Sequence, residues 1–275
     1  MSRISGGALI WAKRRWMRVA LAAVAIAMAA GFGRPQAQSS TPRHLAIAAA
    51  SDLQTALPEL VAAFEKDTSA SVAVSFGSSG TLFAQIQNGA PFDLFFSADV
   101  EYPRQLIVRG RADGSSLYEY AKGRIVVWTR RDSGIDVARG LEALTDRRVT
   151  RIAIANPALA PYGRAAVAAL RQKGLYDQVQ GKLVRGDNIS QTAQLVESGN
   201  ADVGILALSL ALGPALQSRG TYAEVPANLH PPIDQAAVVV GASPNKALAR
   251  EFLAYLRRPE SRARLTRLGF VHPGA

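Results

Sequence analysis

The chain has 275 residues and no cysteine, which excludes disulfides, zinc–thiolate sites, iron–sulfur clusters and a cysteine-linked lipid anchor. With 48% hydrophobic and 19% charged residues, its composition is typical of a packed globular protein and excludes a disordered one. The net charge of +11 depends strongly on residues 1–37, which hold six basic residues and no acidic one, so the remainder carries +5. Those remaining charges are scattered, and we expect no nucleic-acid partner.

The first residues have the pattern of an export signal. The basic stretch "KRRWMR" precedes the apolar run "VALAAVAIAMAAGF" at residues 19–32. This run is shorter than the roughly 20 residues that cross a bilayer. We therefore expect residues 1–37 to be a signal peptide cleaved near Ala37, with an uncleaved anchor as the alternative.

From His44 onward, apolar runs of strand length alternate with segments of helical periodicity. In the first part, the strands are expected at residues 44–50, 71–76 and 91–98, and the helices at residues 52–68, 81–89 and 100–110. In the second part, the strands are expected at residues 124–130, 151–157, 181–186, 201–209 and 233–243, and the helices at residues 163–174, 189–199 and 245–270. Such alternation predicts βαβ units.

We predict an α/β protein with two lobes, each a mostly parallel sheet flanked by helices. The first lobe comprises residues 43–120 and 227–275, and the second comprises residues 121–226. Two lobes joined by two chain crossings form a cleft between them, which is a preferred place for a ligand.

The stretch "FGSSGT", residues 76–81, lies where a predicted strand meets a helix. It is not the G-x-S-x-G elbow of a serine hydrolase, because glycine stands on only one side of either serine at the required spacing. None of the three histidines has a triad partner in the sequence. No P-loop, dinucleotide-binding pattern or set of metal-ion ligands is present either.

Anion binding at helix starts is the remaining possibility. Ser51 follows the first strand and Ser79 the second, and each is expected to cap a helix at the carboxyl edge of the sheet. Helix starts offer free N–H groups and a partial positive charge, and Gly77 and Gly80 allow close backbone approach. That both serines only cap helices stays an equal alternative.

Several segments together resemble the periplasmic molybdate-binding proteins of molybdate ABC importers. They are "AIAAASDLQTALPELVAAFEK", "VSFGSSGTLFAQIQNGAPFDLFFSAD", "IAIANPALAPYGRAA" and "VESGNADVGILALS", and the resemblance extends from Leu45 to Phe270. It implies a type II periplasmic-binding-protein fold whose lobes close on molybdate or tungstate. It further implies an oxyanion held by neutral donors, without direct metal-ion ligands and without a cofactor.

Carried over position by position, the resemblance implies hydroxyl donors at Ser51 and Ser79. Tyr162 and Ile189 occupy places where the family supplies backbone N–H groups. Where some members have a tyrosine hydroxyl, this chain has Ala207, so that donor is lost or replaced, with the Tyr162 hydroxyl as a candidate. Asp52 follows Ser51, and we expect its carboxylate to point away from a dianion, with only its N–H close to the ligand.

The sequence thus predicts a non-enzymatic, monomeric periplasmic receptor that delivers molybdate, and tungstate as well, to a membrane ABC permease. The alternatives are the same fold binding sulfate or phosphate, a serine hydrolase with a degenerate elbow, and a ligand-sensing domain.

Overall fold

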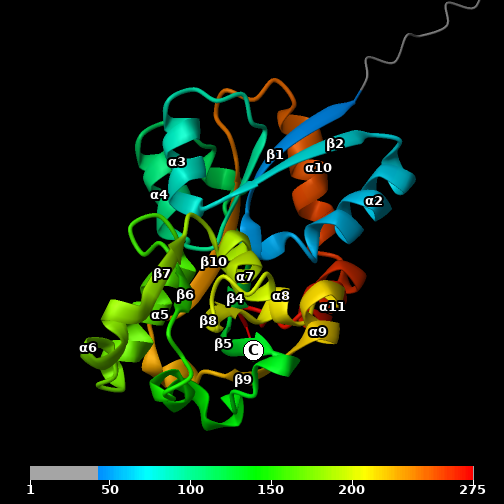
Figure 1. Ribbon diagram of the computed structural model, residues 1–275. Coiled ribbons are helices and arrows are strands. Elements are labelled where there is room, and N and C mark those ends of the chain that lie inside the picture. Colours follow the sequence, from blue (N-terminus) through cyan, green and yellow to red (C-terminus); the bar gives the residue numbers. More distant parts are fainter. Residues whose placement is uncertain (1–42, 275) are drawn as a thin grey trace, which may run out of the picture. The chain divides into compact units, whose positions relative to one another are not determined.

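The computed structural model describes residues 43–274, so the predicted signal peptide at residues 1–37 lies outside the described part. Two five-stranded sheets organise this part of the chain, with strand orders β2-β1-β3-β10-β4 and β7-β6-β8-β5-β9 (Figure 1). Each sheet has one strand that runs against the other four. The predicted α/β architecture of two mostly parallel, helix-flanked sheets is confirmed.

The first sheet is built around β1 (His44–Ala50), which pairs in parallel with β2 (Ser71–Gly77) and β3 (Leu94–Ser97). The reversed strand is β10 (Ile233–Val239), which pairs antiparallel with β3 and with β4 (Tyr118–Gly123). The C-terminal part of the chain therefore returns to the first sheet.

Alternate residues of the first-sheet strands face two different helical layers, because strand side chains point to opposite faces in turn. On one face, Leu45 and Ile47 share an apolar cluster with residues of α2 (Leu57–Thr68) and α10 (Lys246–Leu256). On the other face, Ala48 and Phe95 cluster with α3 (Ser79–Gln87) and α4 (Glu101–Val108). Both faces are covered, as in other parallel sheets.

The second sheet centres on β6 (Ile152–Ala155), which is parallel to β7 (Leu183–Gly186) and β8 (Val203–Ala207). Its reversed strand is β5 (Ile125–Arg130), which lies between β8 and β9 (Gly220–Glu224). The helices α5 (Pro161–Gln172) and α7 (Ile189–Glu197) follow β6 and β7 directly. The remaining helices are α6 (Tyr176–Val179), α8 (Leu208–Ala211), α9 (Pro214–Arg219) and α11 (Pro259–Arg267).

The sequence did not predict two of the strands, β4 and β9. Both carry charged or polar residues between apolar ones, and β9 is mostly exposed, so neither has the continuous apolar run of a buried strand. Because β4 pairs with β10 as far as Gly123, residues 121–123, which the predicted division assigned to the second lobe, belong to the first sheet.

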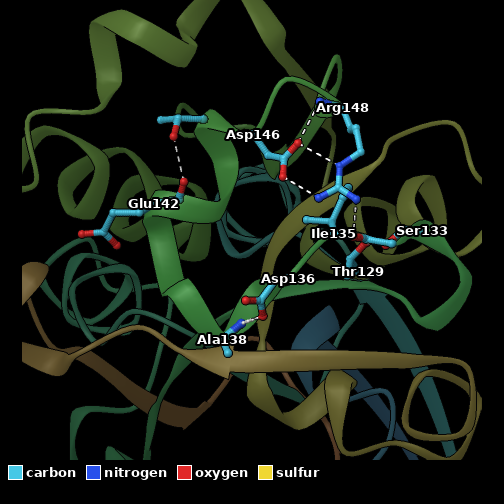
Figure 2. A network of polar contacts seen from close by, with 10 residues as sticks. Thr129, Ser133, Ile135, Asp136, Ala138, Glu142, Asp146 and Arg148 are labelled. Atoms are coloured by element: carbon cyan, nitrogen blue, oxygen red, sulfur yellow. Dashed lines mark hydrogen bonds and ion pairs between the residues drawn. The ribbon is translucent and has the colours of Figure 1, made fainter.

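The connection between β5 and β6 is a second feature that periodicity did not indicate. It contains the 3-10 segment Val137–Thr145 and is held by short polar side chains (Figure 2). Asp136 accepts the N–H of Ala138 at 3.0 Å, and Asp146 accepts both the backbone N–H of Arg148, at 2.9 Å, and its guanidinium. These contacts satisfy N–H groups that an irregular segment leaves unpaired.

The first helix starts later than predicted. Residues Ser51–Leu53 form one 3-10 turn, and α2 begins only at Leu57. Pro58 lies in the first turn of α2, a position that proline favours because its missing N–H has no helical partner there.

Between Arg43 and Gly274, no helix is both long and apolar enough to cross a membrane.

Candidate oxyanion site

The start of α3 places Ser78 and Ser79 in different roles. Ser78 is the N-cap, and its hydroxyl oxygen accepts the N–H of Thr81 at 3.3 Å. Ser79, expected from the sequence to cap this helix, is instead its first residue, since the chain turns helical one residue after Ser78. Ser79 is fully buried, and its hydroxyl oxygen accepts the N–H of Ala98 at 3.0 Å, which leaves its own hydrogen free to donate.

Ser51 lies at the carboxyl end of β1, as predicted, but it does not cap a helix, because the 3-10 turn and Pro58 delay α2. Its hydroxyl reaches the second half of the structure instead. It donates to Oδ1 of Asn188 at 3.1 Å and accepts the N–H of Ser190 at 3.3 Å. The end of β1 is therefore in direct contact with the start of α7.

The second sheet contributes two helix starts. Asn188 caps α7 by accepting the N–H groups of Ser190 and Gln191, which makes Ile189 the first helical residue. Tyr162 is the second residue of α5, directly after Pro161. Because β6 and β7 are parallel neighbours, both helices begin at the same edge of the second sheet.

Three first-turn N–H groups share one property. The N–H groups of Ser79, Tyr162 and Ile189 have no hydrogen-bond acceptor within residues 43–274, although all three residues are buried. The first N–H groups of a helix lack intrahelical partners, and leaving one buried and unpaired is costly. Such groups are donors for a ligand with several acceptor oxygens.

The facing ends of the two sheets are in contact. The N–H of Gly80 in α3 donates to the carbonyl of Leu159, just before α5, at 2.9 Å. A Cβ at position 80 would lie 2.8 Å from that same oxygen, so only glycine permits the approach. Ala50 and Ala98, at the ends of β1 and β3, share an apolar cluster with Tyr162 and Ile189. The predicted site residues thus lie at one junction between the sheets.

A buried polar network crosses the same junction. Oδ2 of Asp52 accepts the hydroxyl of Tyr162 at 2.9 Å and Nε2 of Gln235 at 2.7 Å. Oε1 of Gln235 accepts the hydroxyl of Tyr120 at 2.7 Å. The Tyr162 hydroxyl lies so close to Gly123 that a Cβ at this position would clash with it.

Burial governs the pKa values in this network. It raises the pKa of Asp52 from 3.8 to about 6, and the hydrogen bonds from Gln235 and Tyr162 only partly oppose this shift. Burial also raises the pKa of Tyr162 and of Tyr120 well above their ordinary value, with the Asp52 charge adding to the effect. Both phenols therefore remain neutral donors.

Two pockets are lined by residues that neighbour the junction. One, of about 290 Å³, is lined by Ala98, Pro161 and Arg164 among others, and the guanidinium of Arg164 is paired with Asp99 across it. The other, of about 260 Å³, is lined by residues that include Thr55 and Ser190. Neither pocket is lined by the buried residues Ser51, Ser79, Tyr162 or Ile189.

The arrangement suits binding better than catalysis. The Ser78 hydroxyl is bonded to Oγ1 of Thr81 at 2.7 Å, and His230 is bonded to the carbonyl of Pro231, so neither forms part of a nucleophile–base pair. In residues 43–274, no three His, Cys, Asp or Glu residues come together as metal ligands.

The sequence did not single out Asn188, Gln235, Tyr120 and Ser209 as members of this junction. Asn188 directly precedes a predicted helix and could have been recognised as its cap. Gln235 is a polar residue inside the apolar strand "IDQAAVVV", a signal for a buried hydrogen-bonded group. Ser209 donates to the carbonyl of Asp52 at 2.8 Å, a contact that no local pattern indicates.

The sequence pattern that defines bacterial extracellular solute-binding proteins matches residues 45–271. The chain belongs to this family. Its curated relatives include the "Molybdate-binding protein ModA" of Azotobacter vinelandii, 34% identical over 89% of this chain and 95% of the relative. The protein of the same name from Rhodobacter capsulatus is 34% identical over 90% of this chain and 95% of its own length.

A solved structure agrees with this family assignment. The periplasmic molybdate-binding protein of Azotobacter vinelandii superimposes on this solute-binding protein with a TM-score of 0.79 and 35% identity. The match covers 83% of this chain and 99% of that one. The resemblance inferred from the sequence is therefore confirmed, as is membership of a family that binds its ligands and does not convert them.

Proposed function

We propose that this solute-binding protein captures molybdate, and tungstate as well, between its two sheets and delivers it to an ABC permease. Its molybdate-binding relatives supply the ligand class. The observation that carries the proposal is the group of three buried, unpaired N–H groups at Ser79, Tyr162 and Ile189, which lies beside the hydroxyls of Ser51 and Ser79.

These donors match the needs of a buried tetrahedral dianion. An oxyanion that leaves water must exchange its hydration for hydrogen bonds, because a buried unpaired charge is costly. The N–H groups of α3, α5 and α7 offer such bonds together with the partial positive charge of each helix start. Ser51 has only its hydroxyl to contribute, since the short turn after it is not a helix of this kind, and this hydroxyl would exchange its bond to Asn188 for one to the oxyanion.

The proposed receptor has two lobes that close on the ligand. We place the boundary at Arg124, between β4 of the first sheet and β5 of the second. The family's extracellular location, together with the signal peptide predicted at residues 1–37, supports a periplasmic protein. Closure around the oxyanion would then be the feature that the permease recognises.

Calorimetric titration of the exported chain with molybdate, tungstate, sulfate and phosphate tests the ligand. We expect heats of binding with molybdate and tungstate and weaker binding or none with the other two. An affinity for sulfate equal to that for molybdate would instead assign the site to oxyanions in general.

A pair of variants tests the donors. Ser79→Ala removes a hydroxyl donor to a buried charge, and we expect affinity to fall by about 1–3 kcal/mol, roughly 5- to 150-fold. The matched control is Ser78→Ala, which removes the α3 cap and should cost about 1 kcal/mol of stability with a smaller effect on affinity. Equal effects of the two variants on affinity would show that Ser79 acts only through the helix.

A further inference from the structure

The carboxylate of Asp52 is the one strongly perturbed acidic group at the junction of the two sheets in residues 43–274. It is completely buried. Oδ2 accepts hydrogen bonds from Tyr162 and Gln235, whereas Oδ1 has no partner among the described residues. A carboxylate oxygen without a partner and away from water is an unfavourable place for a negative charge.

The groups around Asp52 leave this charge uncompensated. Its titratable neighbours are phenols, Tyr162 from α5 and Tyr120 from β4, and both remain protonated. From β10 the carboxylate meets the neutral side chain of Gln235, and from α8 the Ser209 hydroxyl bonds the backbone carbonyl of Asp52. The described residues form no ion pair between Asp52 and any Lys, Arg or His.

Asp52 also lies among the proposed oxyanion donors. It directly follows Ser51, whose hydroxyl contacts the start of α7, and its carboxylate contacts Tyr162 in the first turn of α5. A dianion held by these two helix starts would bring further negative charge close to the carboxylate. Like charges in one buried site favour protonation of the group that can accept a proton.

We infer that oxyanion capture by this protein is coupled to the uptake of one proton by Asp52. The inference rests on the proposed function. The proton comes from solvent, and no other bond is made or broken. It neutralises the carboxylate and turns its unpartnered oxygen from a repelling group into a hydroxyl donor.

The coupling predicts the direction of the pH dependence. In an open form with Asp52 in water, the carboxyl would have a pKa near 3.8, whereas in the closed form burial raises it to about 6. Affinity therefore strengthens as the pH falls through about 6, where only the closed form holds the proton. Between about pH 8 and pH 5 this amounts to roughly a tenfold gain, and to more if the bound dianion raises the pKa further.

The test measures proton uptake directly. Calorimetric titration with micromolar molybdate, in two buffers of different ionisation enthalpy, reports the number of protons taken up for each oxyanion bound. At about pH 6 we expect at least roughly half a proton for the wild type, with affinity about tenfold higher near pH 5 than near pH 8.

Asp52→Asn is the decisive variant, because an amide is neutral, has nearly the shape of the protonated acid and also offers one accepting oxygen and a donor group. We expect it to bind molybdate with no proton uptake, with an affinity independent of pH, and more tightly than the wild type near pH 8. The matched control, Asp113→Asn, changes a partly buried carboxylate that lies away from the junction and is paired with Arg250, and it should keep the wild-type pH dependence.

The outcomes separate this inference from the proposed function. A wild type that binds no molybdate at any pH contradicts the proposed function. A wild type that binds molybdate without proton uptake overturns the coupling alone, and this measurement stands even if Asp52→Asn fails to fold. An Asp52→Asn protein that folds and keeps the pH dependence assigns the proton to another group and also overturns it.

Discussion

Gly80→Ala tests whether the contact between α3 and the segment before α5 forms when the ligand is bound. Gly80 lies in the first turn of α3, and its N–H donates to the carbonyl of Leu159 at 2.9 Å. In an open form this contact would be broken, so the added methyl group would clash with the Leu159 backbone only in the closed form, while the Tyr102 hydroxyl, the far end of a side chain in the same lobe, can move aside in both forms. The variant should therefore act on closure and not on folding.

The magnitude follows from the geometry. The new Cβ would lie 2.8 Å from the Leu159 carbonyl oxygen and 3.0 Å from the Tyr102 hydroxyl, whereas ordinary contacts begin at 3.4 Å. The two segments must therefore separate by about 0.6 Å, an overpacking that costs roughly 1–3 kcal/mol. We expect molybdate affinity to fall roughly 5- to 150-fold.

Stability without ligand should change in the opposite direction. Alanine favours a helix by up to about 1 kcal/mol over glycine, so the ligand-free variant should unfold at an equal or higher denaturant concentration. Calorimetry gives the affinity, and urea unfolding gives the stability. Gly181→Ala is the matched control, because no atom lies within 4 Å of a Cβ at that position. Unchanged affinity in Gly80→Ala would refute the reasoning, because the contact would then be absent from the ligand-bound form.

Three further changes address the junction. Tyr162→Phe removes a hydroxyl bonded to Asp52 and should weaken molybdate binding roughly ten- to a hundredfold by calorimetry. It should also raise the pH at which affinity changes, since this hydrogen bond lowers the pKa of Asp52. In urea unfolding with saturating molybdate, which holds the closed form, Asp52→Asn should become more stable relative to the wild type as the pH rises from about 4 to 7, by up to about 3 kcal/mol. The sign follows because the pKa in the folded state is raised from 3.8 to about 6, so the wild type loses stability as the pH rises through that range. Arg164→Gln breaks an ion pair with Asp99 whose side chains are 41% and 26% exposed, so affinity should fall less than about fivefold, and less still at high salt.

For each of these three variants, one result would contradict the prediction. Wild-type affinity in Tyr162→Phe would mean that the phenol contributes nothing to the bound state. A stability difference for Asp52→Asn that stays constant with pH in saturating molybdate would show that the carboxylate holds no extra proton in the ligand-bound protein. A loss of molybdate affinity of more than about tenfold in Arg164→Gln would mean that the partly exposed Arg164–Asp99 pair contributes more to binding than a surface ion pair can.

The sequence by itself was sufficient for the order of the elements and the general place of the site. Strand β1 was predicted with its observed bounds, because a short run of apolar residues ending at a polar one has few other interpretations. The alternation of strands and helices implies parallel sheets, and parallel strands bring Ser51 and Ser79 to one edge. These conclusions depend on local periodicity, which each segment carries within itself.

What the sequence could not show depends on contacts between distant segments. The difference between Ser78 as cap and Ser79 as first helical residue is a shift of one position, finer than periodicity resolves. The prediction that Asp52 turns away from the ligand rested on its charge alone, whereas its surroundings come from Tyr162, 110 residues along the chain, and Gln235, 183 residues along. Burial and hydrogen-bond partners set its pKa, and both exist only once the two sheets meet. The tertiary structure therefore decided the electrostatic character of the site, because desolvation is a property of the packed molecule and not of any segment.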